Sequence, residues 1–104
     1  MKLMAIGEGV SLSATGAGAA VQPNATPFVQ GREAVAVVDV RGVAGSPIIR
    51  LQGSDDGTTW TDLVVHSGNP PAKMTQITLP KYLRYNVTAA GTTGTANVYL
   101  LGAA

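Results

Sequence analysis

The sequence predicts an all-β fold, an antiparallel β-sandwich of jelly-roll-like form with about six to eight short strands. Apolar and polar residues alternate along several short segments, which is the pattern of strands buried on one face. Turn residues interrupt the chain roughly every eight to twelve positions, a spacing typical of sandwiches and barrels. No segment repeats its apolar residues with a helical period of about 3.6, so no helix is expected.

The first part of the chain, residues 1–31, is expected to form an N-terminal strand followed by an extended arm or loop. Residues 13–31 carry no charged side chain and are punctuated by glycine and proline, which interrupt both helices and strands. A loop of this length inside a small domain is usually functional or mobile. Two interpretations of its role stay open: a crossover laid over the sandwich, or an arm that orders against a neighbouring molecule. The candidate binding residues of such an arm are Val21, Pro23, Pro27 and Phe28.

Residues 32–104 are expected to form the sandwich itself, and the whole chain is expected to be one domain. Residues 33–40 are rich in β-branched side chains and apolar on both faces as far as Asp39, as in a central strand. A turn at 42–47 separates this segment from an alternating strand at 48–53.

The pair Asp56-Gly57 predicts a tight hairpin turn, because glycine readily adopts the positive φ that such turns require. A loop is expected at 66–71, where glycine and proline gather again, and another turn at 89–94. The remaining strands are expected at residues 58–65, 74–79, 82–88 and 95–101.

Composition narrows the classes of function. Charged residues make up only 12% of the chain, about half the usual share, so we expect a neutral surface that is easily buried against a partner. The net charge is +1 and the basic residues are dispersed, whereas nucleic-acid binding normally needs a basic stripe. The chain has no cysteine, which excludes disulfides and thiolate metal sites. The apolar run near Met1 is too short for a signal peptide or a membrane span, so we expect synthesis in the host cytoplasm and no membrane partner.

No catalytic, cofactor-binding or metal site is expected. The one histidine, His66, has Ser67 beside it, but adjacent loop residues seldom reach the geometry of a nucleophile and its base. We therefore interpret His66 as a solvated loop residue. The acids Asp55, Asp56 and Asp62 lack the further spaced ligands of a calcium loop, and the hairpin turn already explains Asp56. The chain is accordingly predicted not to be an enzyme.

Trp60 is the only tryptophan and the candidate aromatic of a binding site. Exposed beside a tyrosine it would offer a sugar ring a stacking surface, whereas buried it would anchor the core. Its position just after the turn favours partial burial over the hairpin. The motifs at 24–26 and 86–88 match the N-glycosylation pattern, but we see no secretory signal before them and interpret them as chance matches.

Two parts of the sequence together resemble small bacteriophage virion β-sandwich proteins. Residues 49–63, IRLQGSDDGTTWTDL, are similar to the LQGSxDGxTWxDL hairpin of that family. Residues 81–88, KYLRYNVT, and 94–100, GTANVYL, are similar to its closing strands. The likeness covers roughly residues 33–102, and related hairpins also occur in tail proteins and in discoidin-like carbohydrate-binding modules.

The resemblance implies a structural protein of the capsid decoration (cement) type. Such a protein would sit on the outer capsid surface of the virion as a homotrimer and stabilise the capsid by bridging adjacent major capsid proteins. The motif describes a hairpin rather than a site, so no functional residue is carried over, and residues 1–30 lie outside the likeness. The alternative is a carbohydrate- or host-surface-binding module of a phage tail or adhesion complex, with a glycan as partner and Trp60 exposed. Head or tail location, oligomer number and the capsid site stay open.

Overall fold

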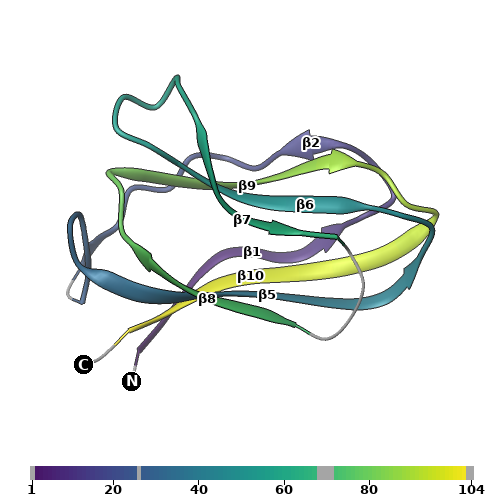
Figure 1. Cartoon of the computed structure of the whole chain (residues 1–104), viewed down its shortest axis with the longest axis horizontal. Coiled ribbons are helices and arrows are strands. Elements are labelled where there is room, and N and C mark those ends of the chain that lie inside the picture. The colour runs from purple at the N-terminus through teal and green to yellow at the C-terminus, as the bar shows by residue number, and fades with distance from the viewer. Residues whose placement is uncertain (1, 26, 68–71, 103–104) are drawn as a thin grey trace.

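The computed structural model describes residues 2–25, 27–67 and 72–102, and its architecture is a sandwich of two four-stranded antiparallel sheets (Figure 1). Sheet A contains, in order across the sheet, β1 (Lys2–Ser11), β10 (Thr93–Gly102), β5 (Glu33–Ala44) and β8 (Lys73–Thr78). Sheet B contains β2 (Gly16–Ala17), β9 (Tyr82–Ala89), β6 (Ile48–Ser54) and β7 (Thr61–His66). A small separate hairpin joins β3 (Asn24–Ala25) to β4 (Phe28–Val29). Thr26 of the first glycosylation motif and residues 68–71 of the expected loop lie outside the described residues.

The strand order is that of a jelly roll, which confirms the predicted fold class. Apart from the β3–β4 hairpin, the antiparallel partners nest: β1 pairs with β10, β2 with β9, β5 with β8, and β6 with β7. The chain therefore forms one long antiparallel ribbon, closed at the β6–β7 connection and open at its termini. Wrapping this ribbon places successive strand pairs in opposite sheets, which is the double Greek key of jelly rolls. At the open end Lys2 pairs with Gly102, and Figure 1 shows the two termini together at one corner.

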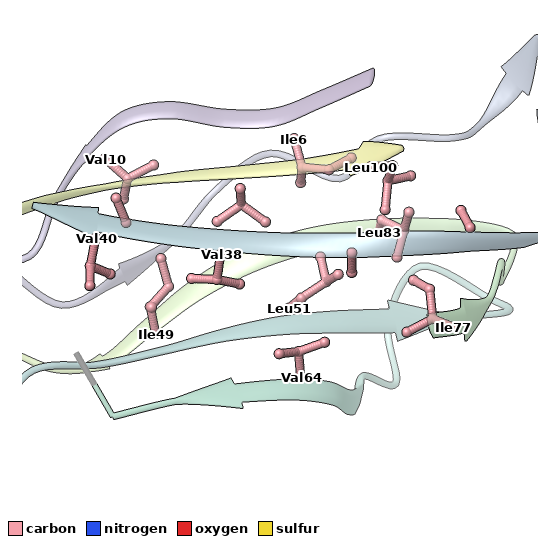
Figure 2. Packing of buried hydrophobic residues seen from close by; sticks show 14 of the residues in the cluster. Ile6, Val10, Val38, Val40, Ile49, Leu51, Val64, Ile77, Leu83 and Leu100 are labelled. Atoms are coloured by element: carbon pink, nitrogen blue, oxygen red, sulfur yellow. The ribbon is translucent and has the colours of Figure 1, made fainter. Parts of the chain in front are cut away.

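The core fills the space between the two sheets, as Figure 2 shows. Alternation along β10 turns Ala96, Val98 and Leu100 inward, and all three have no exposed surface. From sheet B, Ile49 and Leu51 meet them with no exposed surface either. Burying residues of this size contributes about 1.5–3 kcal/mol each, which makes the two inner faces the main source of stability.

Two connections differ from the sequence expectations. Strand β5 runs on to Ala44 through most of the turn expected at 42–47, because Thr93 and Thr95 of β10 continue to pair with it. Gly42 allows this extension with a φ of 63° where the β5–β10 register shifts.

The β6–β7 connection occupies residues 55–60, so the return strand begins at Thr61 rather than at 58. Gly57 adopts the expected positive φ, 78°, but the turn around it is not a tight one. The carboxylate of Asp56 accepts hydrogen bonds from the backbone N–H groups of Thr58 and Thr59, at 2.9 and 2.8 Å. These bonds stabilise a longer loop, because they satisfy backbone donors that strand pairing would otherwise have to satisfy.

Candidate interaction surfaces

The segment between β1 and β5 lies against the chain's own sheet B. The N–H of Gly18 donates to the carbonyl of Tyr85 at 2.9 Å, and Val21 exchanges two backbone hydrogen bonds with Leu83, at 2.7 and 2.8 Å. Val21 is half-buried, and the other three candidate arm residues are buried: Pro23, Pro27 and Phe28. This placement matches the crossover interpretation of residues 13–31, and in this conformation the fold itself holds the four side chains.

The ring of Tyr85 is enclosed by two glycines of the first part of the chain. A Cβ atom on Gly18 would lie 2.2 Å from Cε2 of the ring, and one on Gly7 would lie 2.7 Å from Cδ2. Real carbon atoms do not approach so closely, so both positions need glycine for the ring to fit. The crossover is therefore fitted to sheet B by shape as well as by hydrogen bonds.

The outer face of sheet A carries two rows of apolar cross-strand neighbours. One row is Leu3, Leu101 and Val35, and the other runs from Tyr99 through Val37 to Met74. We call these six residues the apolar face. Leu3 and Met74 expose 61% and 69% of their surface, which is unusual for large apolar side chains on one sheet face.

A shallow groove crosses the apolar face, and charged groups lie at its two ends. A groove of about 430 Å³ runs over it, with Val35, Met74, Gln76 and Leu101 among its lining residues. At one end of β5, Glu33 accepts a hydrogen bond from Gln76 at 2.7 Å, and at the other Arg41 pairs with Asp39 at 3.2 Å. An apolar centre with charged groups at its edges has the make-up of a protein interface. Residues 33–40, expected to form a central strand because they are apolar on both sides, contribute Val35 and Val37 to this face.

The outer face of sheet B is polar and is organised around Gln52, which is only 9% exposed. Its Nε2 donates to Asp62 Oδ1 at 2.9 Å, and its Oε1 accepts from Arg84 Nε at 2.9 Å and from Asn86 Nδ2 at 3.3 Å. Arg50 pairs with the other oxygen of Asp62. The hydrogen bond from Gln52, and then the neighbouring Arg50, hold the pKa of Asp62 below its usual range.

Trp60 stands at the edge of this network and is half-buried, as its position after the turn predicts. The guanidinium carbon of Arg84 lies 4.3 Å from the centroid of the Trp60 ring, in a cation–π stack. One face of the ring is therefore covered within the chain. Of the other aromatic residues, Tyr82 has Lys81 over its own ring, at 5.5 Å, and Tyr99 belongs to sheet A.

His66 is 3% exposed, so the expectation of a solvated loop histidine is wrong. It is the last residue of β7 and pairs with Ile49, because β7 remains joined to β6 over its whole length. Alternation from the buried Val64 turns the side chain of His66 inward. Ser67, the neighbour considered above as a possible nucleophile, is exposed.

The acidic residues considered as metal ligands serve different local purposes. The pKa of Asp56 is well below its usual range because it accepts hydrogen bonds from the Thr59 and Thr58 backbone and from the Ser54 hydroxyl. Asp62 belongs to the network of sheet B, whereas Asp55 lines an open groove under the hairpin. Within residues 2–25, 27–67 and 72–102, no group of three or more His, Asp or Glu residues is placed to hold a metal ion.

No protein-family model matches this chain, and no curated protein or solved structure matches it either. The described part of the chain has no helix with the length and apolar character needed to cross a membrane.

Proposed function

We propose that this chain is a non-enzymatic structural protein of a phage particle, which decorates the capsid and stabilises it by bridging adjacent major capsid proteins. The observation that carries the proposal is the apolar face of sheet A. Leu3 and Met74 are among its most exposed members, and covering side chains of this kind is worth about 1.5–3 kcal/mol each. The phage assignment is supported by the resemblance of residues 49–63 to virion hairpins.

The physical mechanism of the proposal is contact between preformed, weakly charged surfaces. Strand residues lose little conformational freedom on docking, so burial of the apolar face is offset by only a small ordering cost. Attachment as a trimer on the outer capsid surface makes each contact support the others, because the second and third contacts form within one complex. Weak individual contacts then suffice to hold neighbouring capsid subunits together.

Co-expression with a major capsid protein from the same genome tests the proposal. We expect the chain to sediment with assembled shells, to raise the temperature at which the shells dissociate, and to be an oligomer by light scattering. Met74→Glu adds a charge to the apolar face, at a side chain that is 69% exposed and outside the core. We expect this variant to bind shells at least tenfold more weakly.

Ala90→Glu is the matched control, since it adds the same charge at an exposed residue between β9 and β10. It should bind shells within about twofold of the original chain. A chain that is strictly monomeric and does not sediment with shells contradicts the proposal, as does a gene neighbourhood without a capsid protein. Equal binding by the two variants would remove the apolar face from the mechanism.

A further inference from the structure

Arg84 stacks on Trp60 on the outer face of sheet B. Arg84 comes from β9, whereas Trp60 immediately precedes β7, so the two residues meet across β6. The guanidinium carbon lies 4.3 Å from the ring centroid, and the hydrogen bond from Nε to Gln52 at 2.9 Å restricts rotation of the guanidinium group. Arg84 is thus held in one orientation before any partner arrives.

Gln52 can hold Arg84 firmly because it is itself held. Its amide nitrogen donates to Asp62, and its carbonyl oxygen accepts from two donors, Arg84 and Asn86. The residues that hydrogen-bond to this nearly buried side chain all lie on strands of sheet B. Arg84 is therefore supported by the rigid part of the fold and not by a loop alone.

The charges of this surface do not balance. Arg50 and Arg84 bring two positive charges, and Asp62 brings one negative charge, which is paired with Arg50. The partner of Arg84 is a neutral amide, and neither ion pair in the described part of the chain includes Arg84. Only its Nε is used in the side-chain hydrogen bonds of the described residues, so the two terminal nitrogens remain as donors.

We propose that Trp60 and Arg84 form an anchor for a carboxylate side chain of a partner protein on the outer face of sheet B. The two terminal nitrogens of a guanidinium present parallel N–H donors that match the two oxygens of a carboxylate. Holding the fork in place beforehand removes much of the entropy cost of binding. Tryptophan and arginine are also the residues that most often dominate protein interfaces.

The same geometry favours an acidic protein segment over a sugar. A sugar ring recognised by tryptophan lies flat on the indole face, and Arg84 covers one face of Trp60. The anchor lies on the opposite side of the sandwich from the apolar face. It goes beyond the proposed function and does not depend on it, since each surface can be altered without touching the other.

Trp60 also provides the readout, because it is the only tryptophan of the chain and its fluorescence reports on Arg84. The probe is a hexaglutamate peptide, titrated into the full chain at neutral pH and low salt, with a hexaglutamine peptide alongside. We expect a saturable fluorescence change with hexaglutamate only. Arg84→Lys keeps the charge but loses the fork, and should weaken binding at least tenfold. Arg84→Gln, which also removes the charge, should abolish it.

Arg41→Lys is the matched control, because Arg41 is an exposed arginine on sheet A whose side chain is 77% accessible. It should bind hexaglutamate within about twofold of the original chain, and circular dichroism should show that all variants are folded. Hexaglutamate binding that survives Arg84→Lys overturns the proposal, since a point charge would then be enough. Tighter binding of tetragalacturonate than of hexaglutamate would overturn it in favour of an acidic glycan. Shell binding by Met74→Glu and Ala90→Glu is a separate measurement, so failure of the anchor and failure of the apolar face are distinguishable.

Discussion

Replacing Gly18 by alanine tests whether the crossover between β1 and β5 stays docked on sheet B. The new Cβ would lie 2.2 Å from one carbon of the Tyr85 ring and 2.6 Å from two others. Either the ring must move, which as overpacking costs about 1–3 kcal/mol, or the crossover must lift away. Lifting would break the hydrogen bond of Gly18 and the two that join Val21 to Leu83, worth about 1 kcal/mol each. Both routes therefore cost a similar amount.

We expect Gly18→Ala to lower the free energy of unfolding by about 2 kcal/mol, which corresponds to a fall of roughly 8–16 °C in melting temperature. Urea unfolding and calorimetry measure the two quantities. In a Tyr85→Ala background the ring is gone, so the same substitution should cost almost nothing. Gly9→Ala is the contrasting variant: nothing lies within 4 Å of its Cβ, and only its φ of 59° makes alanine unfavourable. Its cost should be the same in both backgrounds.

Two results would refute this reasoning. If Gly18→Ala is harmless, the crossover is not held against Tyr85 as described. If it costs equally with and without the ring, then the penalty does not arise from their contact. Either outcome would reopen the interpretation of residues 13–31 as an arm that docks on a neighbour.

Three further predictions follow from the core, the hairpin and the network. Leu51→Ala leaves a cavity at a side chain with no exposed surface, so urea unfolding should show a loss of about 2–5 kcal/mol; a loss below about 1 kcal/mol would contradict the packing. Ser54→Ala removes a hydroxyl that accepts from the Gly57 N–H at 2.9 Å, and should cost about 1 kcal/mol, whereas Thr58→Ala, which keeps the backbone bonds, should cost less. The pKa of Asp62 is lower in the folded state than in the unfolded chain, where it is about 3.9. The charged carboxylate therefore stabilises the fold above this unfolded-state pKa, and the stabilisation is lost as the pH falls through the folded-state pKa. Asp62→Asn should therefore flatten the acid side of the stability-versus-pH curve measured by urea unfolding, and an unchanged slope would count against the network.

The fold could be predicted largely because alternation and turn chemistry are local signals. Alternation alone places Ala96, Val98 and Leu100 on one face of a strand, and the structure buries all three. The positive φ of Gly57 follows from the hairpin signal in the same way. The length of that turn does not, because the side chain of Asp56 competes with strand pairing for the backbone donors.

The candidate surfaces were harder to predict because they depend on register. Gln52 and Arg84 are 32 positions apart and meet only through the pairing of β6 with β9. Leu3, Val35 and Met74 likewise share a face only because β10 and β5 lie between β1 and β8. The side chain of His66 points inward because β7 stays paired with β6 as far as this residue. The glycine and prolines that follow from position 68 predict a loop and so give no indication of this pairing. Sequence patterns give each strand its two faces, and tertiary pairing decides which residues become neighbours.

The nesting of the strand pairs also determines at what stage of folding the apolar face forms. Its innermost hairpin, β6–β7, joins residues close in sequence, while its outermost pair joins Lys2 to Gly102. Closing a long loop costs more entropy than closing a short one, so pairing that proceeds outward from the hairpin reaches β1 and β10 last. Leu3, Tyr99 and Leu101 all belong to this final pair. A chain that has not finished folding thus lacks half of the surface by which it is proposed to assemble, so the proposed assembly would require a completely folded chain.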